Sequence, residues 1–424
     1  MLRNYLKLTM KVLRRKRVYT AVTLAGIVIP VTFIVLVTSF LVQINNYRSP
    51  RSNFRNVFFL DNLVWEQVMD DGTVNQQNNN PPNLWFVQKY VMTMETPKLV
   101  SVISNSFDMN NEPIYHGTSM SNASVLYTDD IFWQIADFRF LSGRPYNHAE
   151  YEQEARVVII DRKTSMDVFG TIDATGEEIR IKNRMFRVTG VVENTDITMY
   201  RIAANLYIPY SCLDSYHSDN IYSNFSRALL LAENRNDFEK MNREFKTKLS
   251  YVTFENTGNL NRIDGTLTRD SYLKRIEALA GTYFHYHKEI KKPLYIAGLL
   301  LVFLFILLPA INLVNININR VYERLSEIGV RKTFGATIRK LTGQFLFENV
   351  VITFAGGILS ILLSAVIISI LNRTDALGGV YMKMNYAGFV ISLTAILVIG
   401  VLSGILPSVT MARARIVECL NSSE

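Results

Sequence analysis

Residues able to do catalytic or metal chemistry are scattered through this sequence. It has five histidines, and two of them, His285 and His287, are spaced i, i+2, which on a helix points the rings apart. The two cysteines, Cys212 and Cys419, lie in different segments, so no disulfide framework and no CxxC metal site is indicated. A GxxxxGK[ST] phosphate-binding loop is missing from the sequence. We therefore expect neither a catalytic constellation nor a metal or ATP site in this chain.

A charged segment between two long apolar stretches carries the strongest pattern, "RVYERLSEIGVRKTFGAT", which begins at Arg320. On a helix its apolar residues share one side, and Glu327 lies four residues before Arg331, the favourable order for an ion pair. Gly335 fits the end of this helix and Thr337 fits the cap of the next one. The segment predicts an amphipathic interfacial helix, joined at both ends to membrane spans, that a soluble partner can push as a lever. A solvated basic loop that only sets topology is the alternative.

Four apolar stretches are long enough, at about 20 residues, to cross a bilayer as helices. We do not interpret the first as a signal peptide, because its apolar core is too long and no small-x-small cleavage site follows it. With 49% hydrophobic and 19% charged residues, the composition suits a few membrane helices plus a large exterior domain. The predicted fold class is thus an α-helical membrane protein with four transmembrane helices and a large α+β extracytoplasmic domain between the first two.

Charge sets the predicted orientation in the membrane. Residues 1–18 and the loop 320–340 are rich in Lys and Arg, whereas the long exterior segment is slightly acidic. By the positive-inside rule both termini and this loop are cytoplasmic, so the protein is a multi-pass protein of the inner (cytoplasmic) membrane. The net charge of +8 is then a cytoplasmic excess and gives no indication of nucleic-acid binding.

The predicted organisation has nine parts along the chain. They are a cytoplasmic basic tail (1–18), transmembrane helix 1 (19–44), the extracytoplasmic core domain (45–292), transmembrane helix 2 (293–319), the cytoplasmic charged helix (320–340), transmembrane helix 3 (341–371), an extracytoplasmic turn (372–385), transmembrane helix 4 (386–408) and a cytoplasmic tail (409–424).

The exterior domain is large enough for two subdomains, and local patterns predict several of its elements. The polar stretch 70–83 is interpreted as an exposed loop between strands, and 90–104 as extended chain. "ARVVIIDRKTSMDVFG" predicts a strand over 156–160 and then a helix that ends at Gly170. Alternating residues on both sides of Lys182 predict a hairpin.

Two further helices are predicted near the end of the exterior domain. Residues 227–249 are typical of a strand and then a helix, with Asn236 or Asp237 as its cap. Residues 269–292 are helical in pattern and lead into the second span, so we expect a stiff stalk there. A separate surface helix is the alternative for this segment.

Small residues recur along two of the predicted spans. Gly356, Ser360 and Ser364 are spaced i, i+4, i+8 on the third span, and Gly400 and Gly404 form a GxxxG pattern on the fourth. Small side chains let helix backbones approach closely in lipid, where no hydrophobic drive to association exists. We interpret both stripes as helix-packing seams, with incidental glycines as the alternative.

The stretch "ERLSEIGVRKTFGATIRKLTGQFLFENVVITFAGGILSILLS" closely resembles the signature of FtsX/MacB-like permeases of ABC transporters. That signature runs R-x-x-EIG-x-RK-x-x-GA, then QFL-x-E, then a glycine pair. "LSGRPY" and "TGEEIRIKNRMFRVTGVVENTD" resemble the MacB-type extracytoplasmic core domain. The resemblance covers nearly the whole chain and implies a type VII, mechanotransmission permease subunit without a fused ATPase domain. This sequence departs from the family's pattern at the C-terminal tail, where Ile416 stands in place of a proline.

The resemblance also implies partners and roles. It implies two copies of a separate ABC ATPase that bind ATP and Mg²⁺, so this chain is expected to be no enzyme and to hold no cofactor. A second permease chain, as homodimer or paralogous heterodimer, is implied, beside membrane lipid and a periplasmic adaptor or outer-membrane factor. The coupling helix that docks on the ATPase would consist of Glu323, Arg324, Glu327, Ile328, Gly329, Arg331, Lys332, Gly335 and Ala336.

The function that the resemblance implies is efflux or extraction of a periplasmic substrate, driven by ATP in the cytoplasm. Two alternatives stay open. One is a signal transmitter that transports nothing and activates an exterior partner such as a cell-wall hydrolase. The other is a membrane receptor that works without any ATPase.

Overall fold

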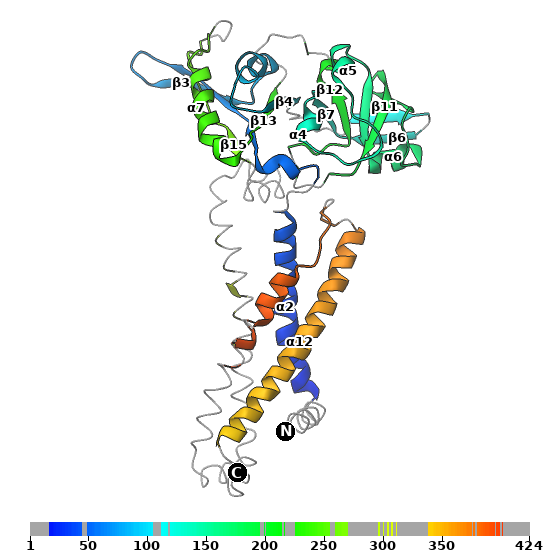
Figure 1. The fold of residues 1–424 in the computed structure, drawn as a ribbon, viewed down its shortest axis with the longest axis vertical. Helices are drawn as coiled ribbons and strands as arrows, with labels where there is room; N and C mark the ends of the chain where they lie inside the picture. The colour runs from blue at the N-terminus through cyan, green and yellow to red at the C-terminus, as the bar shows by residue number, and fades with distance from the viewer. Residues whose placement is uncertain are drawn as a thin grey trace. The chain divides into compact units, whose positions relative to one another are not determined.

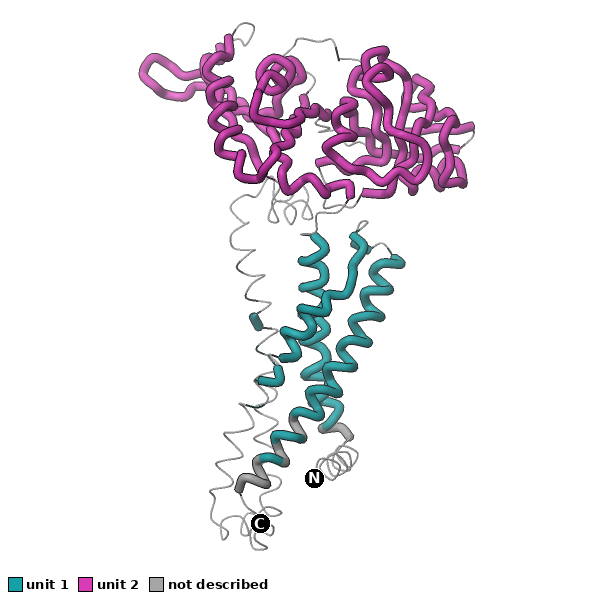
Figure 2. The backbone as a smooth tube through the Cα atoms, in the orientation of Figure 1, with its two compact units in different colours: residues 1–45, 281–424 teal, residues 46–280 magenta. Residues whose placement is uncertain are grey.

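The structure, a computed structural model, describes two compact units of the chain. It describes residues 17–44, 49–104, 112–117, 119–195, 199, 201–213, 216, 225–254, 259–269, 338–374, 376–377, 380–394 and 396–398, with seven single positions at 296, 300, 303, 304, 307, 311 and 401. Residues 46–280 form one unit, which corresponds to the predicted exterior domain and keeps that name here. Residues 1–45 and 281–424 form the other, called the helical unit (Figure 2).

The exterior domain is an α+β domain built on one large mixed sheet (Figure 1). Its strands are β1 (Val57–Leu60), β2 (Leu63–Val68), β3 (Val74–Asn80), β4 (Leu99–Ser104), β5 (Glu112–His116), β6 (Ser119–Ala123), β7 (Val125–Thr128), β8 (Phe140–Gly143), β9 (Val157–Asp161), β10 (Glu178–Ile181), β11 (Arg184–Val192), β12 (Leu206–Pro209), β13 (Ser226–Leu231), β14 (Arg262–Gly265) and β15 (Thr268–Arg269). The 12-stranded sheet has the order β15-β1-β13-β4-β7-β12-β9-β11-β10-β5-β6, with β8 beside β11, and β14-β2-β3 form a separate sheet.

Short helices pack against these sheets. They are η1 (Ser52–Arg55), α3 (Leu84–Phe86), η2 (Val87–Val91), α4 (Phe132–Ile135), α5 (His148–Glu152), α6 (Arg162–Phe169), η4 (Tyr210–Cys212), η5 (Arg235–Asp237) and α7 (Phe238–Leu249). The predicted strand and helix around 156–170 are confirmed: Asp161 caps α6 by accepting the N–H of Thr164 at 2.8 Å, and Gly170 ends it with φ of +70°. The predicted hairpin is confirmed as β10 and β11, which turn at Lys182.

Two local predictions were wrong. The polar stretch 70–83 is not a loop along its whole length, because β3 pairs along β2 through backbone bonds that need no apolar side chains. Of the segment 90–104 only β4 is extended, since Asn83 accepts the N–H of Phe86 at 3.0 Å and starts α3, which runs on into η2. The predicted cap of α7 is confirmed at Asp237, whose carboxylate accepts the N–H of Asn234 at 2.9 Å in the capping box of the preceding turn η5.

The large sheet is narrowest between β4 and β7. These strands share one residue pair, Ile103 with Thr128, whereas β4 pairs with β13 along its whole length. The first lobe consists of β15, β1, β13 and β4 of the large sheet, together with the small sheet and η2. The second lobe consists of the other strands of the large sheet, which follow β4 in the sheet order, together with α5. A shared aromatic core that includes Phe59, Phe132 and Tyr207 holds the lobes together. The exterior domain is therefore a single compact unit with a natural boundary inside it.

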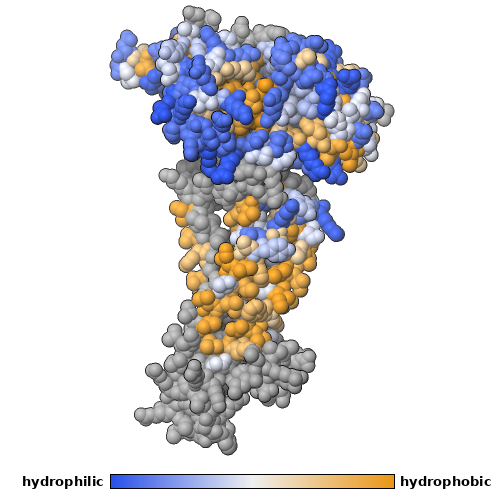
Figure 3. All heavy atoms as spheres, in the orientation of Figure 1, coloured by the Kyte–Doolittle hydropathy of each residue, from blue (hydrophilic) through white to orange (hydrophobic). Residues whose placement is uncertain are grey.

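Within its described residues, the helical unit contains two helices long and apolar enough to cross a membrane. They are α2 (Arg17–Ile44) and α12 (Ile338–Thr374), and a shorter apolar helix covers Tyr386–Val398. The apolar windows of α2 and α12 are only 33% and 39% buried, so neither is the core helix of a soluble domain. Their surface is apolar (Figure 3), and side chains such as Ile29 and Ile358 are exposed while Thr353 and Ser360 are buried. Large apolar groups outside and small polar groups inside are what a lipid solvent favours.

The other predicted spans are described in part. Six single positions of the second, from Ile296 to Ile311, are helical and exposed, and the rest of that span lies outside the described residues. The predicted third span, 341–371, falls within α12, which continues to Thr374. The predicted stalk, 269–292, lies outside the described residues except for its first one, Arg269.

Candidate functional site

The helices α2 and α12 meet along small side chains. A Cβ added to Gly356 of α12 would lie 2.8 Å from the Ile27 side chain of α2. The Ser360 hydroxyl donates to the backbone carbonyl of Gly356 at 2.7 Å and contacts that of Val28 at 3.4 Å. Ser364 is fully buried. The structure thus places all three predicted residues of the third span on the inner side of α12, and we name Gly356, Ser360 and Ser364 the small-residue seam.

The helix Tyr386–Val398 packs on the same pair of helices. A Cβ on Gly357 would lie 2.8 Å from the Leu393 side chain, and the N–H of Asn385 donates to the Ser39 hydroxyl at 2.9 Å. Apolar residues of all three helices form one buried cluster. Since their backbones approach where side chains are smallest, we propose that the small-residue seam holds these helices together.

Substituting leucine for Gly356 tests this proposal. The new side chain would overlap Ile27, and overpacking of this kind costs about 1–3 kcal/mol. We expect the purified full chain with Gly356→Leu to lose its monodisperse peak in size-exclusion chromatography after heating to a lower temperature than the unmodified chain needs.

Gly343→Leu is the matched control, because Gly343 lies in the same helix and a Cβ there has no neighbour within 4 Å among the residues that the structure describes. Equal thermal behaviour of the Gly356 and Gly343 variants would show that the close contact does not hold the helices.

The remaining predicted site residues lie outside the described part of the chain. This applies to the whole predicted coupling helix, 320–336, and to Gly400 and Gly404 of the fourth span. The docking role of the first set and the packing role of the second therefore stay predictions.

The first and last described strands of the exterior domain lie together at one edge of the large sheet. β1 is the first described strand after α2, and β15 is the last described strand before residue 270. They pair antiparallel, with Phe58 opposite Arg269 and Phe59 opposite Thr268. β13 continues the sheet on the other side of β1 over four residue pairs. The two ends of the described domain are therefore joined by direct strand pairing.

The carboxylate of Asp61 ties this edge together. Asp61 follows β1 and accepts a hydrogen bond from Nη2 of Arg201 at 2.7 Å. Nε of Arg227, from β13, lies 2.7 Å from the same carboxylate as an ion pair. The Thr268 hydroxyl of β15 donates to it at 2.8 Å. Arg201 also lies over the Phe59 ring, 4.2 Å from its centre, and its side chain is only 4% exposed. We call Asp61, Arg201, Arg227 and Thr268 the junction cluster.

Sequence reasoning did not find the junction cluster. Its members come from four segments separated by up to 207 residues, and none has a distinctive local pattern. The one local signal is an aspartate directly after the apolar strand Val57–Leu60. Within the described residues no group of three or more His, Cys, Asp or Glu side chains is placed to hold a metal ion.

Comparison with known families assigns both halves of the chain. Residues 20–248 match the MacB-like periplasmic core domain, and residues 299–416 match the FtsX-like permease C-terminal domain. These are permease domains, and no ATPase domain is identified in the chain.

Two curated relatives align with most of the sequence. The macrolide export ATP-binding/permease protein MacB of Pasteurella multocida is 26% identical over 302 residues, which are 71% of this chain and 43% of the relative. The uncharacterized ABC transporter permease YknZ of Bacillus subtilis is 26% identical over 314 residues, 71% of this chain and 70% of the relative. The chain thus spans less than half the length of the macrolide export protein.

Two solved structures are also similar to parts of the chain. The extracellular domain of the noncanonic ABC-type transporter YknZ from Gram-positive bacteria matches with a TM-score of 0.36 and 12% identity, over 49% of this chain and 99% of that structure. The periplasmic region of MacB from Actinobacillus actinomycetemcomitans matches with a TM-score of 0.33 and 18% identity, over 45% and 83%.

Proposed function

The chain belongs to the family of ABC transporter permeases that join a MacB-like periplasmic core domain to an FtsX-like C-terminal domain, and from this we propose that it transmits ATP-driven movement from the cytoplasm to its exterior domain. Chemistry on the nucleotide then belongs to a separate ATPase partner, which binds ATP and Mg²⁺. The permease supplies the membrane helices and the moving exterior domain.

The junction at the edge of the large sheet is the observation that carries this proposal. Since β1 and β15 are paired, helix movements that reach the domain through its two connections act on the same strands. The junction cluster adds side-chain contacts to these backbone bonds and extends them to β13. A movement of β1 or β15 would act on its paired neighbour and, through β13, on the 12-stranded sheet.

The proposal includes the arrangement of the whole complex. Four spans, with both termini and the 320–340 segment in the cytoplasm of the inner membrane, would place the exterior domain outside. Two permease chains would meet two ATPase subunits, each docked on a coupling helix formed by residues 320–336. Work done on the exterior domain would drive efflux or extraction of a periplasmic substrate. The name of the Pasteurella relative gives macrolide export for that protein.

Purification of the intact complex tests the function. The tagged full chain is expressed alone and together with an ABC ATPase encoded in the same genome, and ATP hydrolysis is measured on each preparation. We expect an ATPase to copurify and hydrolysis to depend on it. A second preparation carries an ATPase whose phosphate-loop lysine is replaced, which should bind and not hydrolyse. A stable, folded permease that recruits no ATPase would favour the receptor alternative instead.

A further inference from the structure

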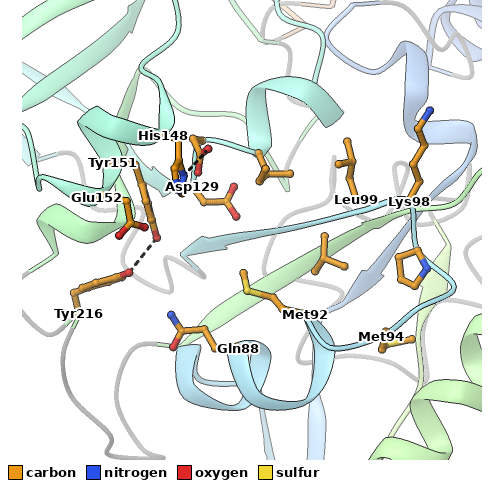
Figure 4. A pocket seen from close by; sticks show the side chains of 14 residues that line it. Gln88, Met92, Met94, Lys98, Leu99, Asp129, His148, Tyr151, Glu152 and Tyr216 are labelled. Atoms are coloured by element: carbon orange, nitrogen blue, oxygen red, sulfur yellow. Dashed lines mark hydrogen bonds and ion pairs between the residues drawn. The ribbon is translucent and has the colours of Figure 1, made fainter.

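A cavity of about 470 Å³ lies at the boundary between the two lobes of the exterior domain (Figure 4), within the range of small-molecule sites. We call it the interlobe pocket. β4 and η2 of the first lobe line one side, and α5 with the turn after β7 lines the other. Its lining includes Met92, Leu99 and Val100 on the first side and Asp129, Asp130 and Glu152 on the second.

The pocket exists because strand pairing stops at Asp129. Beyond the single pair of β4 and β7, the Asp129 carboxylate accepts the N–H of Val102 at 2.8 Å and the hydroxyl of Ser101 at 2.7 Å. It also accepts the N–H of Phe132 at 2.9 Å, which turns the chain into α4. The following residues therefore leave β4, and a space opens beside Leu99.

The lining combines an apolar surface with an excess of carboxyl groups. Met92, Met94 and Leu99 supply much of the apolar part. Asp129, Asp130 and Glu152 supply three carboxyls, against one lysine and one histidine, and that histidine, His148, contacts Asp130 at 3.2 Å.

Side chains from both lobes are turned toward this space. In Figure 4 the Asp129 carboxyl, the Met92 side chain and the Tyr151 hydroxyl point into it. Tyr151 and Tyr216 approach each other with their hydroxyls 3.5 Å apart. Burial raises the pKa of Asp129 to about 7, although three donated hydrogen bonds act in the opposite direction. A positively charged neighbour in the pocket would stabilise the ionised form of this buried carboxyl.

A metal ion is a poor match for this lining. Within the described residues no three His, Cys, Asp or Glu side chains converge on one point, so the carboxyls cannot form a coordination shell. Methionine side chains are flexible and polarizable, and they adapt to apolar bodies of varied outline. A molecule with both a positive charge and an apolar body satisfies both parts of the surface.

We propose that the interlobe pocket binds an organic cation, an amine or quaternary ammonium group attached to an apolar body, with its charge toward Asp129, Asp130 and Glu152. This inference goes beyond the proposed function and does not depend on it, since binding requires neither ATP nor an ATPase. The ligand would contact both lobes, so its binding would bias their separation across the narrow β4–β7 boundary.

Methyl NMR of the full chain in lipid nanodiscs tests the proposal, with methionine methyl groups labelled with ¹³C. The probe is benzyltriethylammonium, and benzenesulfonate is the aromatic anion control. Met92 and Met94 line the pocket, whereas Met120 on β6 is exposed elsewhere in the same domain. Signals are assigned by Met→Leu substitutions. We expect the cation to shift the Met92 and Met94 signals to saturation and to leave Met120 unchanged.

Variants of the lining decide whether the carboxyls select the ligand. Asp130→Asn combined with Glu152→Gln should raise the dissociation constant about tenfold, because both charges are lost. Glu95→Gln, an exposed glutamate next to Met94 that does not line the pocket, should bind as the unmodified chain does. Val100→Trp should fill the cavity and abolish binding.

Tryptophan fluorescence of the carboxyl variants, which add no tryptophan, and an unshifted Met120 methyl signal in every variant verify that the domain is folded. Three results would each overturn the proposal: equal shifts by benzenesulfonate, unchanged affinity in the double variant, or no saturable shift of Met92 and Met94 up to about 10 mM cation.

Discussion

Replacing Asp61 by alanine is expected to lower the free energy of unfolding of the exterior domain by about 3–5 kcal/mol. The substitution removes the carboxylate that contacts both Arg201 and Arg227, and the Arg201 side chain is 4% exposed. Removing the carboxylate from a guanidinium group that is held out of water destabilises the folded state. The cost in free energy is far larger than the contribution of an exposed ion pair. The hydrogen bond from Thr268 is lost as well, so the pairing of β1 with β15 should loosen.

Urea unfolding followed by tryptophan fluorescence measures this effect in the full chain. The three tryptophans, Trp65, Trp85 and Trp133, all lie in the exterior domain, so the signal reports on that domain alone. Asp264→Ala is the matched control. Asp264 pairs with Lys246 at the surface, where 61% of the carboxylate side chain is exposed, and its loss should cost about 0–1 kcal/mol. Similar unfolding midpoints for both variants would mean that backbone pairing alone holds the junction.

Replacing Glu327 by lysine is expected to abolish coupling to the ATPase while leaving insertion and the exterior domain intact. The predicted Glu327–Arg331 pair, if it lies on an exposed helix, would contribute only about 0.3–0.5 kcal/mol, so its loss should not unfold the segment. The added positive charge agrees with a cytoplasmic position. At a buried contact with the ATPase, however, a reversed charge costs about 2–5 kcal/mol, which corresponds to a loss of affinity of about 30-fold or more.

Coexpression with the ATPase partner separates these effects. Complex yield and transport-linked ATP hydrolysis are measured at matched membrane expression, with Glu177→Lys in the exposed part of the exterior domain as the control for charge reversal. If the Glu327 variant assembles and works normally, the 320–340 segment is a topology signal only and the docking interpretation is wrong.

Several features of this protein follow from its sequence alone, because they depend on residues close together in the chain. The length and apolar character of α2 and α12 predict membrane spans without reference to any partner. The strand, cap and left-handed glycine from Val157 to Gly170 are all local, and so is the turn at Lys182. The signature around Glu327 indicated the permease family that the comparisons then showed.

The small-residue seam was determined in part by the local sequence and in part by the tertiary structure. The spacing of Gly356, Ser360 and Ser364 predicts that they share one side of a helix, which is a local property. Which helix they meet is not local: only the tertiary structure shows that Ile27 and Val28 of α2, more than 300 residues away, face them.

The features that carry the two proposals about the exterior domain were decided by the tertiary structure. β1 and β15 become neighbours across 209 residues, counted from Phe59 to Thr268, through backbone hydrogen bonds that leave no signature in side-chain type. The same is true of the asparagine-rich strand β3. Asp61 meets Arg201 and Arg227, and Asp129 lies beside Leu99, only after the sheet has formed. The local sequence around an ionisable residue next to an apolar strand is the same whether its side chain lies in water, in a buried ion pair or in a ligand pocket. The strands that pack around it determine its environment, and so its role.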